Sequence, residues 1–120
     1  MKLLITGACG HIGSYLAHNI HKIKKIKKGY LLDYVKTTQI NSLFNSKKKN
    51  NLRFYFGDLS KKDTLKQFKN VDYIIHLASM TNAASSFKRK NEMYRNNIRC
   101  MENVINHCIK NKAKLIHISS

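Results

Sequence analysis

Five short apolar segments recur along the chain, and each has the length of a buried strand. They occupy residues 2–6, 30–34, 52–56, 73–77 and 114–118. Their hydrophobicity is largely continuous rather than alternating, which is typical of parallel strands that are covered on both faces. The pattern therefore predicts a parallel sheet with helices on its two sides.

Helical periodicity fills the intervals between these segments. The first helix is predicted to bury a face made of Ile12, Leu16, Ile20 and Ile23 and to stop at Gly29. Strands that alternate with helices require right-handed crossovers. The expected strand order is therefore 3-2-1-4-5.

Two more helices are expected further along the chain. A short one is predicted after a cap formed by Ser60 and Asp63, with Leu65 and Phe68 on its apolar side. One face of the long third helix carries Met93, Asn97, Met101, Val104 and Cys108. An inward-facing Asn97 amide must find hydrogen-bond partners. It either fixes a local irregularity of the backbone or helps to order the active-site edge.

The most informative motif joins the first apolar segment to the first helix. Gly7, Gly10 and Gly13 follow Thr6 at regular spacing. Glycine lets the backbone approach a ligand closely, and a helix N-terminus favours a pyrophosphate. An ordinary glycine turn can show the same spacing. The strand–turn–helix context instead favours the dinucleotide-binding loop of a Rossmann-type fold.

An acidic residue follows at the distance that ribose recognition requires. Asp33 comes twenty positions after Gly13, within the second apolar segment. There it would accept a hydrogen bond from a ribose 2′-hydroxyl and repel a 2′-phosphate, which favours NAD over NADP. Lys36 is near enough to weaken that preference. The alternative is a solvated aspartate at the end of a strand.

The third and fourth segments also end in residues of interest. Asp58 could accept the adenine amino group or could serve as a turn or helix cap. His76 is better explained as a satisfied core histidine than as a catalyst. The small residues that follow His76 would leave room for a cofactor beside the switch between strands 1 and 4.

Composition narrows the class of protein. The 120 residues suffice for one domain with a core. We expect no signal peptide, and no apolar run approaches the ~20 residues of a membrane span, so a cytoplasmic protein with no membrane partner is predicted. The three cysteines lack metal-ligand spacing and are interpreted as free thiols. His18 and His21 lack a third ligand, and no metal site is predicted.

The net charge of +17 raises the possibility of a nucleic-acid partner. Lysine, asparagine and isoleucine are jointly enriched and proline is absent, which suggests AT-rich coding. The lysines fall mostly in predicted helix ends and loops, without interleaved aromatic side chains. We therefore predict a solvated basic surface and no specific nucleic-acid partner, with weak binding to polyanions at low salt.

Together these motifs resemble the extended short-chain dehydrogenase/reductases, and more narrowly the NAD-dependent epimerase/dehydratases that act on nucleotide sugars. The matching stretches are TGACGHIG at 6–13, Asp33, GDL at 57–59, HLAS at 76–79, Asn97 and LIHISS at 115–120. Residues 37–45 and 76–87 further resemble a bacterial UDP-glucose 4-epimerase-like branch linked to surface-polysaccharide sugars. The resemblance implies NAD as cofactor, a nucleotide-sugar substrate in the full-length enzyme, and a possible homodimer.

The resemblance also implies individual roles. The pyrophosphate loop corresponds to Gly7, Gly10, His11, Ile12 and Gly13. The ribose acid corresponds to Asp33, and the adenine pocket to Asp58 and Leu59. The segment under the cofactor corresponds to Leu77, Ala78, Ser79 and Thr81. The helix asparagine corresponds to Asn97, although family members differ on which of two adjacent positions binds. The fifth-strand serines that precede the catalytic hydroxyl correspond to Ser119 and Ser120.

The sequence departs from the family in one respect. Family members use a Tyr-xxx-Lys pair, in which the lysine lowers the tyrosine pKa. No tyrosine here has a lysine four positions later. We therefore expect residues 1–120 to form a single NAD(P)-binding domain, truncated before the catalytic pair and the substrate lobe, with a sheet that is incomplete at its C-terminal edge. The alternative is a stand-alone NAD-binding or assembly module without catalysis.

Overall fold

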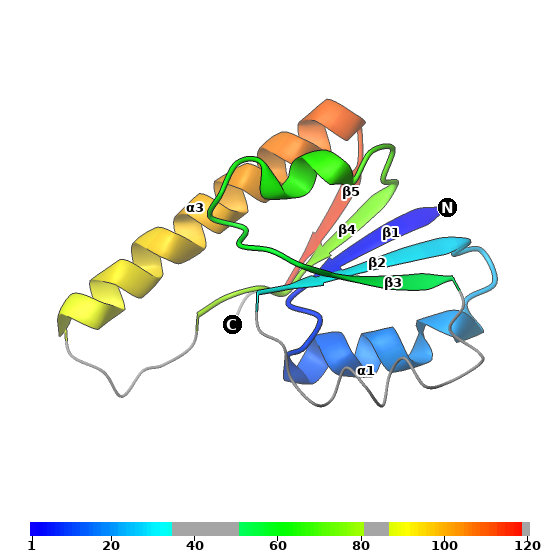
Figure 1. Ribbon diagram of the computed structural model, residues 1–120, viewed down its shortest axis with the longest axis horizontal. Helices are drawn as coiled ribbons and strands as arrows, with labels where there is room; N and C mark the ends of the chain where they lie inside the picture. The colour runs from blue at the N-terminus through cyan, green and yellow to red at the C-terminus, as the bar shows by residue number, and fades with distance from the viewer. Residues whose placement is uncertain (35–50, 81–86, 119–120) are drawn as a thin grey trace.

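The computed structural model describes residues 1–34, 51–80 and 87–118 (Figure 1). Five parallel strands form one sheet in the order β3-β2-β1-β4-β5. The strands are β1 (Lys2–Thr6), β2 (Lys28–Asp33), β3 (Leu52–Phe56), β4 (Tyr73–His76) and β5 (Lys114–His117). The predicted α/β class, parallel pairing and strand order are confirmed. Lys36, Thr81, Ser119 and Ser120 lie outside the described residues.

Gly29 does not end the first helix, and that prediction is wrong. It is the second residue of β2, where it pairs with Leu3 on one side and Leu52 on the other. A Cβ at this position would meet the Leu52 side chain at 2.4 Å. The glycine therefore makes room for a neighbouring core side chain. Strand β2 begins two residues earlier than predicted, and β4 and β5 each end one residue earlier.

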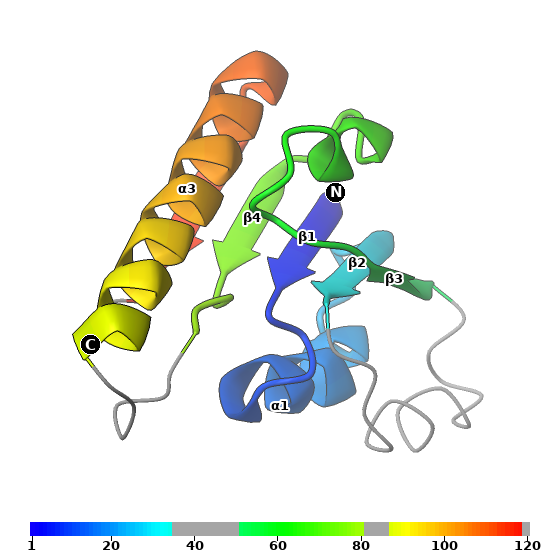
Figure 2. The ribbon, with the colours of Figure 1, turned by 60° about the vertical axis from the view of Figure 1, so that its left-hand side comes forward.

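The helices lie on opposite faces of the sheet (Figure 2). One face is covered by α1 (His11–Asn19) and the 3-10 turn η1 (Ile20–Lys22). The other is covered by α3 (Phe87–Asn111) and by the β3–β4 crossover, which contains the 3-10 turn η3 (Thr64–Gln67). Within the described residues, no helix is both long and apolar enough to cross a membrane.

Strand β1 supplies both cores by simple alternation. Leu4 points into the α3 layer, whereas Leu3 and Ile5 point into the α1 layer, and all three are buried. Successive side chains of a strand face opposite sides. A strand covered on both sides must therefore be apolar throughout, as the sequence pattern predicted.

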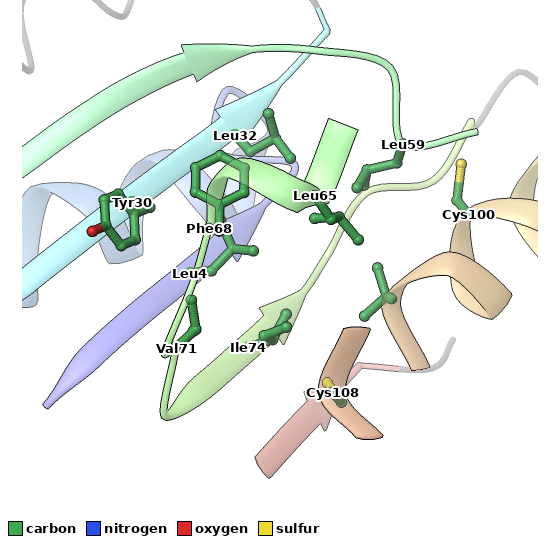
Figure 3. Packing of buried hydrophobic residues seen from close by; sticks show 11 residues of the cluster. Leu4, Tyr30, Leu32, Leu59, Leu65, Phe68, Val71, Ile74, Cys100 and Cys108 are labelled. Carbon is green, nitrogen blue, oxygen red and sulfur yellow. The ribbon is translucent and has the colours of Figure 1, made fainter. Parts of the chain in front are cut away.

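The larger core lies between the sheet and α3 (Figure 3). Its aromatic centre joins the rings of Tyr30, Tyr55 and Phe68, whose centroids lie 5.0–5.8 Å apart. Such tilted and edge-on contacts suit the ring quadrupoles. Leu65 and Phe68 are fully buried as predicted. The crossover is therefore anchored by its apolar side chains, although it contains little regular helix.

The apolar face predicted for the first helix is rotated in the structure. Gly13, Ala17 and Ile20 are buried, whereas Ile12 and Ile23 are 49% and 53% exposed. A Cβ at Gly13 would lie 2.1 Å from the Gly7 carbonyl oxygen. Because α1 approaches the glycine loop this closely, its inner face consists of small residues at this point.

The cap predicted at Ser60 is also wrong. Only the single 3-10 turn η3 forms, and it begins without a side-chain cap. The Ser60 hydroxyl and N–H instead donate to Asp58 Oδ1 at 2.7 and 2.9 Å. Asp58 thus closes a tight turn directly after β3. Its carboxylate holds the Ser60 hydroxyl, which was predicted to cap the helix, within this turn.

Polar side chains of α3 secure the irregular crossover. Asn103 Nδ2 donates to the Leu59 carbonyl at 2.7 Å, and His107 Nε2 donates to the Phe68 carbonyl at 2.8 Å. The Asn111 side-chain oxygen accepts the N–H of Asn70 at 3.0 Å. These bonds satisfy backbone groups that have no partner in a helix or strand. Beside them Cys100, Val104 and Cys108 are buried, and the predicted Met93 and Met101 are only partly covered.

Candidate functional site

A cleft of about 330 Å³ opens at the carboxyl end of the sheet. Its walls come from the glycine loop after β1, from the residues that follow β2, β3 and β4, and from α3. This end contains the switch between β1 and β4, where the strand order reverses. Open α/β sheets bind ligands at this place.

The glycine loop forms the floor of the cleft with a constrained backbone. Gly7 has φ of 72°, and its N–H donates to the Leu32 carbonyl at 2.9 Å. A Cβ there would meet the backbone N of Ala78 at 2.7 Å. Both the left-handed φ and the close approach require glycine. The loop is thereby held against the ends of β2 and β4.

Helix α1 begins beside the cleft without a side-chain cap, and its N-cap residue Gly10 lines the cleft. Gly10 has no side chain that could cap the helix. The first hydrogen bond of the helix runs from the N–H of Ser14 to the Gly10 carbonyl, at 2.9 Å. The preceding N–H groups of a helix have no partner within it. His11 and Ile12 are exposed on this turn, and Gly13 is buried behind it. Uncapped helix N-termini of this kind are known to form cradles for anions.

Asp33 connects β2 to the glycine loop. Its Oδ2 accepts the N–H of Cys9 at 2.8 Å, and its Oδ1 accepts the N–H of Tyr34 at 2.8 Å. The carboxylate lines the cleft. It therefore fixes the loop and also presents a negative charge to any ligand beside it.

Thr6 holds the two sides of the switch together, a role that the sequence pattern did not reveal. Its Oγ1 accepts the N–H groups of Leu77 and Ala78 at 3.2 and 3.3 Å and lies 2.7 Å from His76 Nδ1. Because the hydroxyl accepts two N–H groups, its proton is available for His76 Nδ1. The segment that leaves β4 is thus attached to the end of β1.

His76 is the satisfied core histidine that was predicted. It is buried, and its ring stacks on that of His117 from β5 with centroids 5.6 Å apart. Burial lowers its pKa to about 4, and the neighbouring His117 adds to the shift. A neutral ring that accepts the Thr6 proton at Nδ1 carries its own hydrogen on Nε2.

Asp58 and Cys100 lie on the α3 side of the cleft. Hydrogen bonds from the Ser60 hydroxyl and N–H lower the pKa of Asp58, so its carboxylate is charged. Both bonds use Oδ1. Burial raises the pKa of the Cys100 thiol, and the charge of Asp58 adds to that effect. This wall therefore presents one carboxylate and one neutral thiol.

The hydrogen bonds of Asn97 show the first of the two roles considered for it. Its Oδ1 accepts the N–H of Met80 at 2.9 Å, and its Nδ2 donates to the Met80 carbonyl at 3.3 Å. The amide therefore fixes an irregular piece of backbone after β4. The adjacent Asn96 also lines the cleft, although helix geometry places it about 100° around the axis.

The structure brings most of the predicted site residues to one place. The cleft is lined by Gly7, Gly10, Asp33, Asp58, Leu59, Leu77, Ala78, Ser79 and Asn97. The predicted residues His11, Ile12 and Gly13 do not line the cleft. The lining residues that sequence reasoning missed are Leu32, Tyr34, Gly57, Met80, Asn96 and Cys100. Nothing in their residue types marks them, since only the paths of the strand ends and of α3 bring them here. Among the described residues, no group of three potential metal ligands occurs.

Known proteins are similar to this chain in sequence and in architecture. Residues 3–120 match the NAD dependent epimerase/dehydratase family. The chain is 34% identical to a dTDP-D-glucose 4,6-dehydratase of Dictyostelium discoideum, covering 99% of this chain and 29% of that protein. It is 31% identical to a UDP-N-acetylglucosamine 4,6-dehydratase (inverting) of Campylobacter jejuni, covering 94% of this chain and 34% of that protein.

A solved structure repeats the fold. The dTDP-glucose 4,6-dehydratase of Streptomyces venezuelae superposes with a TM-score of 0.82 at 21% identity, over 98% of this chain and 38% of that one. The chain thus spans about one third of the length of the curated relatives it matches. The match to the family covers nearly every residue, and the chain belongs to the NAD dependent epimerase/dehydratase family.

Proposed function

We propose that this chain is an NAD-binding Rossmann domain. The observation that carries the proposal is the glycine cradle, in which side-chain atoms at Gly7 and Gly13 would collide with backbone and Gly10 begins an uncapped helix beside Asp33. Such a cradle suits a pyrophosphate. The family is NAD dependent. When bound, NAD supplies a hydride acceptor at C4 of its nicotinamide.

The residues of the cleft suggest where each part of NAD would be held. The loop from Gly7 to Gly13 and the first turn of α1, including His11 and Ile12, would hold the pyrophosphate. Asp33 would accept a hydrogen bond from the adenosine ribose and would repel a 2′-phosphate, favouring NAD over NADP. Its carboxylate already lines the cleft next to the loop.

The two ends of the cofactor would lie on opposite sides of this loop. The wall formed by Asp58 and Leu59 is proposed for adenine, because Ser60 uses only one oxygen of the Asp58 carboxylate. The segment Leu77, Ala78 and Ser79, continued by Thr81, is proposed to run under the nicotinamide half. Asn97 would act as a positioning residue, since it holds Met80 at the end of that segment.

We further propose that these 120 residues are the cofactor-binding part of a longer nucleotide-sugar epimerase or dehydratase. Two curated relatives are 4,6-dehydratases roughly three times as long as the matched region. The sequence lacks a Tyr-xxx-Lys pair, so the general base would have to come from elsewhere. Ser119 is proposed to precede that catalytic region. A stand-alone NAD-binding module is the second candidate, and the missing pair is the observation that favours it.

Cys100 and Cys108 are buried free thiols in the structure. Free thiols are typical of a reducing compartment. On this ground we propose the cytoplasm as the place where the protein works.

Titration calorimetry with NAD and NADP tests the proposal. We expect saturable binding of NAD, weaker binding of NADP, and no binding by Gly10→Val. Even a Cβ at Gly10 would lie only 3.3 Å from the Gly7 carbonyl oxygen, so the branched valine side chain would crowd the loop. Equal heats for the wild type and the Gly10→Val protein would contradict a site at the glycine loop. Incubation with NAD and UDP- or dTDP-sugars should give no turnover, because the catalytic pair is missing from the sequence.

A further inference from the structure

The amino end of the sheet, opposite the cleft, carries a dense group of lysines. Lys2, Lys28 and Lys114 lie at the starts of β1, β2 and β5. The turn that leads into β2 and the turn that leaves α3 add further members. We define the basic rim as Lys2, Lys24, Lys25, Lys27, Lys28, Lys112 and Lys114. Its position follows from the parallel topology, because all five strands start at this end (Figure 1).

Backbone hydrogen bonds connect Lys27, Lys2 and Lys114 in a row across the sheet. The N–H of Lys27 donates to the Met1 carbonyl at 2.9 Å, next to the start of β1. The N–H of Asp72 donates to the Lys2 carbonyl at 2.9 Å, and the N–H of Lys114 donates to the Asp72 carbonyl at 2.9 Å. The row therefore runs across the sheet from the turn before β2 to β5.

Within the described residues, no lysine of the rim forms an ion pair. The one ion pair found there joins Lys66 and Asp63, away from the rim. Asp72 is the acid inside the row, and its Oδ2 accepts the N–H of Lys2 at 2.7 Å. The cleft shows the opposite character, because Asp33 and Asp58 line it and none of the described lysines or arginines does. The lining of the cleft and the basic rim thus differ in the sign of their charge.

Exposed apolar side chains lie beside the lysines. Met1 is 40% exposed and precedes Lys2, and Ile23, more than half exposed, precedes Lys24. A row of ammonium groups next to apolar side chains suits the interface of an anionic membrane, where lysines meet phosphate headgroups and apolar groups enter the acyl boundary.

Nucleic acid fits the rim less well. The aromatic rings nearest the row, Tyr30 and Tyr73, are buried or partly buried. The ammonium groups of Lys28 and Lys114 lie over them at 5.6 and 5.7 Å from the ring centroids. No exposed ring is therefore left in the row for bases to stack on. The row also lacks arginine, the residue that pairs with phosphate in a bidentate manner.

We propose that the basic rim docks this protein onto an anionic phospholipid surface, with the cleft facing away from the membrane. This proposal departs from the expectation of no membrane partner, because the gathering of these lysines depends on the strand order and is not visible in the sequence. The proposal is independent of NAD binding, since no rim residue lines the cleft. Attachment would be peripheral and reversible, because it depends on surface charge that salt screens.

Vesicle co-sedimentation tests the proposal, with phosphatidylcholine vesicles prepared with and without phosphatidylglycerol. The rim variant Lys24→Gln/Lys25→Gln/Lys27→Gln removes three exposed lysines. The control variant Lys62→Gln/Lys88→Gln/Lys90→Gln removes three exposed lysines outside the rim and changes the net charge equally. We expect wild-type binding to require phosphatidylglycerol and to fall with salt. The rim variant should lose roughly a hundredfold in affinity and the control variant much less.

Circular dichroism of all three proteins establishes that each is folded. Equal losses in the two variants would overturn the proposal, because net charge rather than the rim would then govern binding. A rim variant that binds vesicles normally but has lost binding to an RNA duplex would also overturn it, by identifying nucleic acid as the partner.

Discussion

The two ends of the sheet are built from the same strands but in opposite ways. At the carboxyl end, Thr6, Gly7 and Asp33 each make hydrogen bonds to neighbouring segments, and Gly13 packs against the loop backbone. At the amino end, the lysine side chains are exposed or only partly covered. The structure of the carboxyl end therefore depends on contacts made by individual atoms. The character of the amino end depends instead on the combined positive charge of several lysines.

This difference indicates where the chain can tolerate substitution. A side chain that would collide with backbone has nowhere to go, whereas one that meets a flexible side-chain end can be accommodated. Removing one of the solvated lysine charges at the amino end weakens the electrostatic field around the protein but leaves the packing of neighbouring side chains intact. Substitutions at the two ends should therefore differ in both size and kind of effect.

The largest effect is expected from a matched pair of glycine substitutions. In Gly13→Ala the new Cβ would lie 2.1 Å from the Gly7 carbonyl oxygen, whereas in Gly29→Ala it would meet the end of the Leu52 side chain. We expect Gly13→Ala to abolish NAD binding and to lower the free energy of unfolding by about 3 kcal/mol or more. Gly29→Ala should bind NAD normally. Calorimetry and urea unfolding measure both, and similar losses in the two variants would remove the distinction between the ends.

Thr6 offers the next largest effect. Thr6→Val removes the hydroxyl that serves Leu77, Ala78 and His76 and leaves these groups without that partner. We expect the free energy of unfolding to fall by about 2–4 kcal/mol. Thr6→Ser keeps the hydroxyl and should recover most of this loss. If valine and serine behave alike in urea unfolding, the hydroxyl does not hold the segment.

Protonation of His76 should weaken the same junction. Its pKa is about 4 in the folded chain and 6.5 as the ordinary value, so the unfolded chain binds more protons between these limits. The contribution of His76 to the free energy of unfolding is therefore fully present above pH 6.5 and is lost as the pH falls toward 4. We expect roughly 3 kcal/mol of loss across this window. Urea unfolding of the wild type and His76→Gln measures it, and a slope that is unchanged in the variant would assign the effect to another group.

Asp33 gives the smallest and most specific change. Asp33→Asn keeps an oxygen for the Cys9 N–H but removes the charge that would oppose a 2′-phosphate. We expect the preference for NAD over NADP to fall by about tenfold. Asp63→Asn, at an exposed ion pair remote from the cleft, is the matched control. A wild type that prefers NADP would contradict the proposed role of Asp33.

The glycine loop and Asp33 could be placed at the carboxyl end from the sequence, because their spacing is local in the chain. The spacing of Gly7, Gly10 and Gly13 and the distance to Asp33 are visible without a structure. The Thr6–His76 bond joins residues seventy positions apart, and the β1–β4 pairing alone brings them together. The face of α1 was misjudged because the approach of Gly13 to Gly7 is also a tertiary contact. The gathering of lysines at the amino end likewise depends on the strand order.

The most direct test of this contrast is an NMR titration of the 15N-labelled chain with NAD. We predict that saturating NAD shifts the amide signals of Gly7, Gly10, Asp33 and Ala78 at the carboxyl end. The signals of Lys27, Lys28 and Lys114 at the amino end should stay unchanged. Shifts confined to the amino end, or none at saturating NAD, would contradict the claim that the glycine cradle and Asp33 form the cofactor site.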